Sequence, residues 1–274
     1  MKFSIVLSTQ PTAFSALAYK GNLAENVANI KKLGYDGVEL AVRNPEQLDV
    51  EFLKSLLKEH SLPVSAIGTG QAYGEDGLSF TNPVEQIRAK AIERIKSQVK
   101  LAEIFNAVVI IGLVRGKLEA ELSIEQAESW LVDALRECAD VSNKIKFAIE
   151  PINRYETNLI NSVDSGLRLL EKVDRKNVGL LLDTFHMNIE EVSLSESIKA
   201  ARDSSFHFHV ADSNRWFPGA GHIDFRTVFD TLNQIKYEGF VSAEIMPLPD
   251  SNTAAKNTIE YLRRLNCEKK RTQI

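Results

Sequence analysis

The sequence predicts an α/β protein built as one (β/α)8 barrel over residues 1–274, and three observations support this fold class. Short strand-like runs alternate with longer helical patterns eight times. The runs are apolar on both faces, as in parallel sheets covered by helices. No linker, low-complexity segment or break interrupts the alternation. Eight uninterrupted units favour a closed barrel over an open sheet.

The predicted elements follow one another at a regular spacing. The strands are expected at 2–8, 36–42, 63–68, 107–112, 145–150, 178–183, 205–210 and 240–245. The clearest helix begins at Asn82-Pro83, a capping residue followed by proline, with Glu85 placed for a capping box. The other helices are expected at 22–33, 46–60, 124–142, 162–174, 194–203, 224–235 and 252–266. Residues 266–274 are expected to fray.

Composition excludes several classes of protein. The net charge of −4 and the pI of about 5.8 give no basic surface of the kind that binds nucleic acid. Cys138 and Cys267 lie far apart in helix-like stretches, which indicates reduced thiols. The apolar run at the start is too short for a signal peptide, and none has membrane length. We therefore expect a soluble, cytoplasmic protein without a membrane partner.

Four predicted strands carry a metal-binding type of side chain at their ends. They are the fifth to the eighth, with Glu150, Asp183, His209 and Glu244 respectively. In a (β/α)8 barrel these ends meet in one mouth, where the loops build the active site. Three carboxylates and an imidazole suit one divalent metal ion, Mn²⁺ foremost and Mg²⁺ or Co²⁺ as alternatives.

Each of these residues could also have a purely structural role, without binding a metal. A single Asp or Glu at a strand end could be a helix cap or a solvated loop residue, but four in succession favour a site. His207 is expected to be a hydrogen-bonded core histidine and not a ligand. His186, three residues after Asp183, can reach the mouth or remain a loop residue. His60 and His222 are expected at the surface.

Five motifs together resemble the xylose-isomerase-like TIM barrels of sugar isomerases and epimerases, most closely the ketose 3-epimerases. They are E-P-x-N-R-x-E at 150–156, L-D-x-x-H at 182–186, H-x-H at 207–209, Arg215 and Glu244. The segments IGTGQAYGEDGLS (67–79), VVIIGLVRG (108–116) and HVADSNRWFPGAGHIDF (209–225) further resemble the 5-keto-L-gluconate epimerase branch, which acts on keto sugar acids. The resemblance covers nearly the whole chain.

The resemblance implies a metal-dependent epimerase that inverts the carbon beside the ketone of a keto sugar acid or ketose, of the 5-keto-L-gluconate or D-tagaturonate type. A proton on that carbon leaves readily only if the developing enediolate is stabilised, which a metal chelating two oxygens achieves. Glu150 and Glu244 would then exchange the proton on opposite faces. By resemblance, the carbonyl end would be held by Glu156, His186 and Arg215, and Arg154 would brace the Glu150 loop.

Other activities use the same fold. An aldose–ketose isomerase such as hydroxypyruvate isomerase would share the metal set, and an inosose-type dehydratase is a third possibility. The abasic-site endonucleases of this superfamily need more metal-binding histidines and a basic face, which the chain lacks. A non-enzymatic sugar- or metal-binding barrel is the alternative outside catalysis.

The far end of the substrate is expected to carry a carboxylate and not a phosphate. After the last strand the chain reads MPLPDSN, with two prolines and no glycine, whereas phosphate sites use free backbone N–H groups. Arg43 and Arg115 follow strands two and four, where they could clamp a carboxylate or remain solvated loop arginines. Trp216 and Phe217 could form a lid over the sugar or an interface patch. A homo-oligomer is therefore one possible state of the protein.

Overall fold

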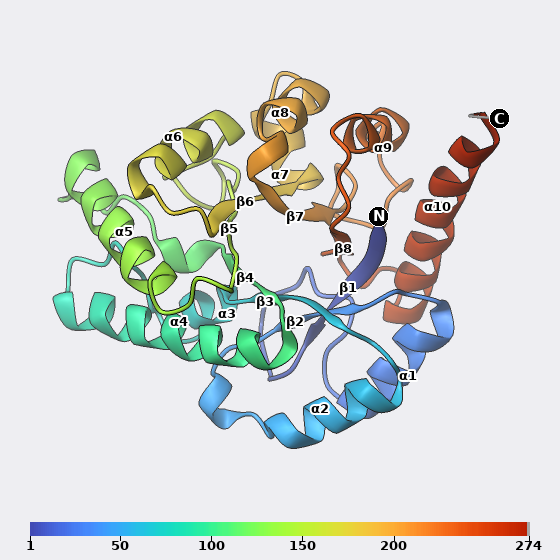
Figure 1. Ribbon diagram of the computed structural model, residues 1–274, viewed down its shortest axis with the longest axis horizontal. Coiled ribbons are helices and arrows are strands. Elements are labelled where there is room, and N and C mark those ends of the chain that lie inside the picture. The colour runs from blue at the N-terminus through green and yellow to red at the C-terminus, as the bar shows by residue number, and fades with distance from the viewer. Residues whose placement is uncertain (273–274) are drawn as a thin grey trace.

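The computed structural model describes the backbone of residues 1–272 and the side chains of residues 1–266. Its centre is a closed barrel in which each strand pairs with the next in parallel, and β1 pairs with β8 to close it (Figure 1). The strands are β1 Lys2–Ser8, β2 Val38–Ala41, β3 Val64–Gly68, β4 Val108–Ile111, β5 Phe147–Ile149, β6 Val178–Asp183, β7 Ser205–Val210 and β8 Phe240–Ala243. The predicted (β/α)8 fold is confirmed.

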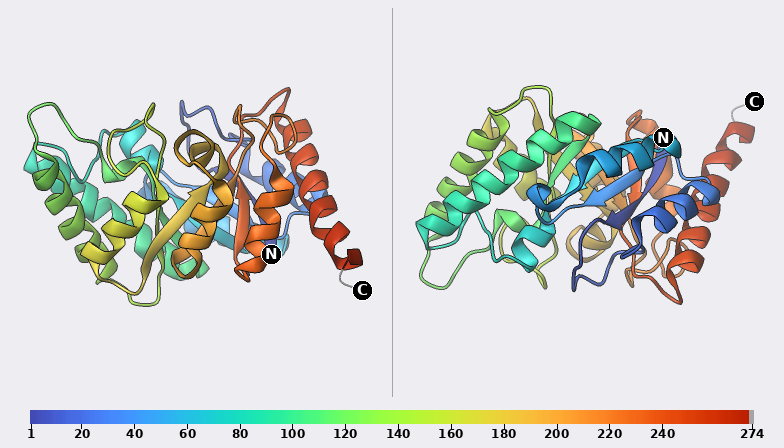
Figure 2. Two further views of the ribbon diagram at one scale, coloured as in Figure 1. Left: turned by 90° about the horizontal axis from the view of Figure 1, so that it is seen from above. Right: turned by 90° about the horizontal axis from the view of Figure 1, so that it is seen from below.

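Helices surround the barrel, and α10 lies beside α1 (Figures 1 and 2). The main helices, one after each strand, are α1 Leu23–Leu33, α2 Val50–Glu59, α4 Glu85–Phe105, α5 Ile124–Ala139, α6 Val163–Val173, α8 Leu194–Ala200, α9 Phe225–Gln234 and α10 Ser251–Thr272. Shorter helical segments lie in the loops: α3 Gly70–Gly74, α7 Thr184–Glu190 and the 3-10 turns η1 Pro45–Gln47, η2 Leu113–Arg115 and η3 Arg202–Ser204. The sequence did not predict α3, α7 or η2, whereas η1 and η3 overlap the ends of the helices expected at 46–60 and 194–203.

Two predicted helix ends were wrong. Helix α4 begins at Glu85 after Val84, without a side-chain cap. The reason is that Asn82 Oδ1 accepts the N–H of Val84 at 2.9 Å, which makes a turn before the helix and not its first cap. Helix α10 continues to Thr272, beyond the predicted end at residue 266. Residues 273–274 of the predicted tail lie outside the described residues.

Alternation along the strands separates two layers. Side chains such as Phe208, Val241 and Ala243 join the large apolar core between strands and helices. Their neighbours in sequence point the other way, into the barrel, where a small cluster of Ala66, Ile110, Ala148 and Leu181 is buried. A residue two positions after an inward one faces inward again. This period brings Glu150, two after Ala148, and Asp183, two after Leu181, to the mouth.

Two sequence expectations concern the chain as a whole. Among the helices of residues 1–272, none has both the length and the apolar character needed to cross a bilayer. Cys138 is a buried free thiol, as expected, whereas the side chain of Cys267 lies outside the described part of the chain.

Candidate active site

The structure brings together the four side chains at the ends of strands β5 to β8. Glu150, Asp183, His209 and Glu244 each offer a ligand atom, and these atoms all lie within 4.8 Å of one another. His209 Nδ1 lies 3.8 Å from Glu150 Oε1 and 3.8 Å from Asp183 Oδ2. Glu150, Asp183 and His209 are buried, and Glu244 is partly buried. The four form one compact group of donors.

This group has unmet bonding capacity of the kind that a cation would fill. Glu150 Oε1, Asp183 Oδ2 and His209 Nδ1 are buried atoms without a hydrogen-bond partner. Such atoms are costly to leave unpaired, and here they face one another. Burial, followed by the nearby carboxylate of Glu244, raises the pKa of Glu150 well above its ordinary value. Three carboxylates and one imidazole fit a divalent metal that prefers oxygen and nitrogen ligands.

Glu39 in β2 is the principal residue that sequence reasoning missed. Its carboxylate oxygens both lie 3.0 Å from His209 Nε2, and Oε2 lies 2.8 Å from His207 Nε2. His207 is therefore a buried hydrogen-bonded histidine, as predicted. Glu39, His207 and His209 could also be viewed as a metal-binding group. Because hydrogen bonds already engage both oxygens and both Nε2 atoms, we interpret the three as support for His209.

This support determines which nitrogen of His209 faces the donor group. A hydrogen bond from Nε2–H to Glu39 leaves the Nδ1 lone pair for a metal. Burial opposes a charged imidazolium, but Glu39, with smaller contributions from Glu244 and Glu150, raises the pKa of His209 to about 10. Binding of a cation at Nδ1 therefore requires loss of a proton from the ring.

Arg215 connects the donor group to the loop after β5. Its Nη1 lies 2.8 Å from Glu156 Oε1, and its Nη2 lies 2.8 Å from Glu244 Oε2. The guanidinium also lies against the ring of Phe185, 4.8 Å from its centroid. Arg215 thus fixes Glu244 and Glu156 relative to each other at one side of the mouth.

His186 reaches the same mouth from α7, and Asn153 orients it. The Nδ2 atom of Asn153 donates to His186 Nδ1 at 2.7 Å and to Glu156 Oε1 at 3.0 Å. Burial, followed by the charge of Arg215, lowers the pKa of His186 well below its ordinary value. The ring is then neutral with its proton on Nε2, which lies 3.7 Å from Glu150 Oε1. Asn153 is a second residue that the sequence analysis did not single out.

Arg154 lies where a supporting residue is expected. Its peptide N–H and guanidinium donate to Glu190, with Nη2 2.8 Å from Oε2. The contact ties the loop after β5 to the end of α7.

The predicted carboxylate clamp was wrong for both arginines. Arg115 is fully buried and donates to the carbonyl oxygens of Gly112, Leu159 and Ile160 at 2.9–3.3 Å, because the turn η2 directs its side chain into the protein. The guanidinium of Arg43 is held by Asp76, with Nε 2.8 Å from Oδ1. Neither arginine lines the pocket described next.

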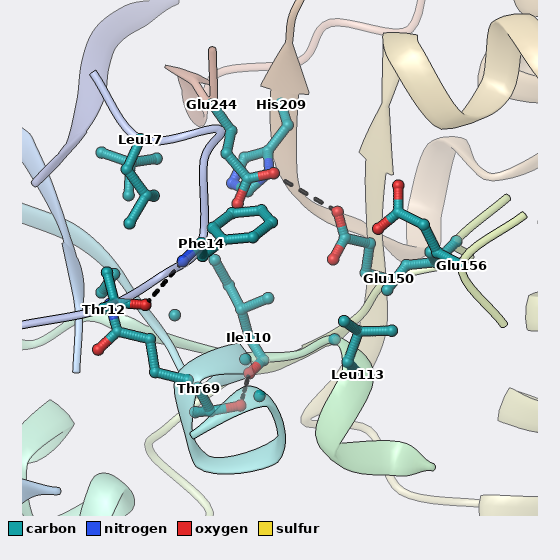
Figure 3. A pocket seen from close by; sticks show the side chains of 18 of the residues that line it. Thr12, Phe14, Leu17, Thr69, Ile110, Leu113, Glu150, Glu156, His209 and Glu244 are labelled. Atoms are coloured by element: carbon teal, nitrogen blue, oxygen red, sulfur yellow. Dashed lines mark hydrogen bonds and ion pairs between the residues drawn. The ribbon is translucent and has the colours of Figure 1, made fainter. Parts of the chain in front are cut away.

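Three members of the donor group, Glu150, His209 and Glu244, line a cavity of about 340 Å³ at the barrel mouth. Figure 3 shows Glu150, His209 and Glu244 grouped on one side, with Thr12 and Thr69 on the opposite side. The wall between is largely apolar and includes Val6, Phe14, Leu17, Ala41, Ile110, Leu113 and Ile152. Trp216 and Phe217, predicted as a possible lid, are not among the described residues that line it.

Comparison with known proteins places this barrel in a family. Residues 27–265 match the family described as xylose isomerase-like TIM barrel, and the chain belongs to it. It is 34% identical to the L-ribulose 3-epimerase of Methylomonas sp. (strain DH-1) over 83% of this chain and 81% of that protein. It is 29% identical to the 3-dehydro-D-guloside 4-epimerase of Escherichia coli (strain K12) over 94% of this chain and 98% of that protein.

A solved structure extends the comparison to the fold. The D-allulose 3-epimerase of Methylomonas sp., in complex with D-allulose, superposes with a TM-score of 0.83 and 26% identity, covering 96% of each chain. These relatives are sugar epimerases, and the protein is accordingly a carbohydrate epimerase, an enzyme of the isomerase class.

Proposed function

We propose that the protein is a divalent-metal-dependent epimerase that inverts the carbon beside the ketone of a ketose or keto sugar acid. The observation that supports this most directly is the shared position of Glu150 and Glu244. Both belong to the donor group, yet they come from different strands, β5 and β8, and both line the pocket. Two carboxylates on separate strands can act on opposite faces of one substrate carbon.

In this proposal Glu150, Asp183, His209 and Glu244 hold the ion, Mn²⁺ foremost, and the ion when bound supplies the positive charge that makes the C–H beside the ketone acidic. Glu150 takes the proton from one face of that carbon, and Glu244 delivers a proton to the other face, or the reverse. Burial raises the pKa of both carboxyl groups, which brings each closer to the range useful for a general base.

The neighbouring residues would position the sugar. Neutral His186 can donate its Nε2–H to a sugar oxygen, and Arg215 can hold an oxygen beside Glu244 without giving up its contact with Glu156. Asn153, which contacts both side chains, keeps His186 and Glu156 at a fixed position relative to each other. In this proposal these contacts would hold the carbonyl end of the substrate between the two bases.

Two substrate classes are each favoured by a different observation. Among the described residues lining the pocket, Arg215 is the sole Arg or Lys, and it already faces two carboxylates. A substrate with its own negative charge would lack a free cation there, which favours a neutral ketose. The segments 67–79, 108–116 and 209–225, which resemble the 5-keto-L-gluconate epimerase branch, favour a keto sugar acid.

A substrate panel tests the proposal. The purified protein loaded with Mn²⁺ is incubated in D₂O with neutral ketoses, ketose phosphates and keto sugar acids, and products are identified by chromatography and NMR. We expect inversion beside the ketone with deuterium at the inverted carbon. Movement of the carbonyl between C1 and C2 would show an isomerase of the hydroxypyruvate type instead. The variant Asp203→Asn, which alters a highly exposed carboxylate, serves as the control.

A further inference from the structure

The loop between β7 and α9 has to hold Arg215 in an uncommon backbone conformation. Arg215 has φ +62°, in the left-handed region that non-glycine residues seldom adopt. Its N–H donates to the carbonyl of Asp212 at 2.8 Å, and its carbonyl accepts the N–H of Met246 at 2.9 Å. The position of its guanidinium therefore depends on the loop backbone.

The carboxylate of Asp212 joins the beginning, middle and end of this loop. Oδ1 accepts the N–H of Ser213 at 2.7 Å and of Ile223 at 3.1 Å, and Oδ2 accepts the N–H of Gly219 at 2.8 Å. The N–H of Asp212 itself donates to the carbonyl of Trp216 at 2.9 Å. Asp212 is fully buried. Burial would raise the pKa of this carboxyl group, but the backbone N–H donors hold it below its ordinary value.

Two glycines allow the chain to approach this carboxylate. A Cβ atom at Gly221 would lie 2.3 Å from Asp212 Oδ1, closer than any side chain can be. Gly219 has φ +94°, and a Cβ there would lie 2.8 Å from the ring of Tyr261. The loop is thus built around the carboxylate with no space for larger residues.

We propose that Asp212 is a positioning residue that fixes this loop so that Arg215 spans Glu156 and Glu244. The inference rests on the proposed function, because that function assigns Arg215 and Glu244 to the sugar site. Asp212 does not line the pocket, and its carboxylate faces backbone N–H groups. Its effect on catalysis therefore passes through the loop to Arg215.

The kinetic test is a double-mutant cycle of Asp212→Asn and Arg215→Ala. Displacing a substrate-positioning group by about 1 Å can cost on the order of a hundredfold, so Asp212→Asn alone should lower kcat by about tenfold to a hundredfold. In the Arg215→Ala background it should lower kcat by less than about twofold, since residues that act through one another are not additive. Equal losses in both backgrounds, or full activity of Asp212→Asn, would overturn the inference.

A matched control separates positioning from general loss of stability. Asp224 lies near the end of the same loop and caps α9 by accepting the N–H groups of Arg226 and Thr227. Asp224→Ala removes that cap and should lower Tm while leaving kcat within about twofold at a temperature where the protein stays folded. A kcat loss in Asp224→Ala equal to that in Asp212→Asn would show that loosening the fold is sufficient, and the inference would fail.

A readout without turnover keeps this inference distinct from the proposed function. Trp216 reports on the loop once the second tryptophan is removed by Trp130→Phe. Asp212→Asn should increase acrylamide quenching of Trp216, and Asp224→Ala should not. Unchanged quenching contradicts the role of Asp212. Increased quenching in a protein that epimerises no sugar of the panel supports the loop role while the proposed function fails.

Discussion

The Nε2 atom of His209 lies 3.0 Å from both carboxylate oxygens of Glu39, and this contact leaves Nδ1 facing the donor group. We expect Glu39→Gln to weaken Mn²⁺ binding by about tenfold to a hundredfold, as loss of an outer carboxylate partner of a ligand histidine commonly does. Titration calorimetry or Mn²⁺ electron paramagnetic resonance measures the affinity. Glu51→Gln, at a highly exposed carboxylate, is the control. Equal affinities in the two variants would mean that Glu39 does not set the ligand geometry.

Removal of divalent metal should abolish turnover. Without a cation, Glu150, Asp183 and Glu244 face one another at close range with raised pKa values, chiefly because of burial. Chelation followed by desalting should eliminate epimerisation, and Mn²⁺, Co²⁺ or Mg²⁺ should restore it. Full activity in a sample shown to be metal-free by elemental analysis contradicts the metal assignment.

Substitution of either proposed base should affect the chemical step more than binding. Glu150→Gln and Glu244→Gln each keep one oxygen of similar shape but remove the proton acceptor. We expect kcat to fall by about two to four orders of magnitude, with a much smaller change in KM. Steady-state kinetics on the best sugar of the panel checks this. A variant that retains wild-type kcat would exclude its residue as a base.

Arg115 should matter for stability and not for substrate charge. Its guanidinium satisfies three buried backbone carbonyls, so Arg115→Ala should lower the free energy of unfolding by at least about 3 kcal/mol. Arg43→Ala, which breaks a partly exposed ion pair with Asp76, should lower the free energy of unfolding much less than Arg115→Ala does. Denaturant unfolding measures both. If Arg115→Ala kept its stability but raised KM for keto sugar acids alone, Arg115 would be a substrate ligand after all.

The Asp76 contacts should make part of the stability depend on pH. Hydrogen bonding from Arg43, and then from Arg94, lowers the pKa of Asp76 below its ordinary value. A lowered folded-state pKa stabilises the protein above the unfolded-state pKa, and this contribution is lost as the pH falls through the folded-state value. The difference in unfolding free energy between wild type and Asp76→Asn should therefore be constant from pH 7 to about pH 5 and shrink below about pH 4. Urea unfolding across this range is the measurement. A constant difference down to pH 3 would show that the carboxylate charge is irrelevant.

The sequence was sufficient to predict the barrel because strand and helix periods are local patterns. It also placed Glu150, Asp183, His209 and Glu244, because all inward residues at the ends of parallel strands must meet. Glu39 was missed since it lies within its strand, and its partners His207 and His209 are distant in sequence. Arg115 shows the opposite kind of error, because it was predicted for the site and lies elsewhere. Its place after a strand suggested the mouth, but the turn η2 directs the side chain into the interior.

The carboxylates that line the pocket have a consequence for how quickly the site fills. Glu39, Glu75, Glu150, Glu156 and Glu244 all line it, whereas Arg215 is the single Arg or Lys among its described lining residues. An acidic concave surface with apolar walls concentrates cations from solution and speeds their encounter. The bimolecular rate at which metal-depleted protein takes up Mn²⁺ should therefore decrease as ionic strength rises, because salt shortens the reach of this field to about 8 Å at 0.15 M.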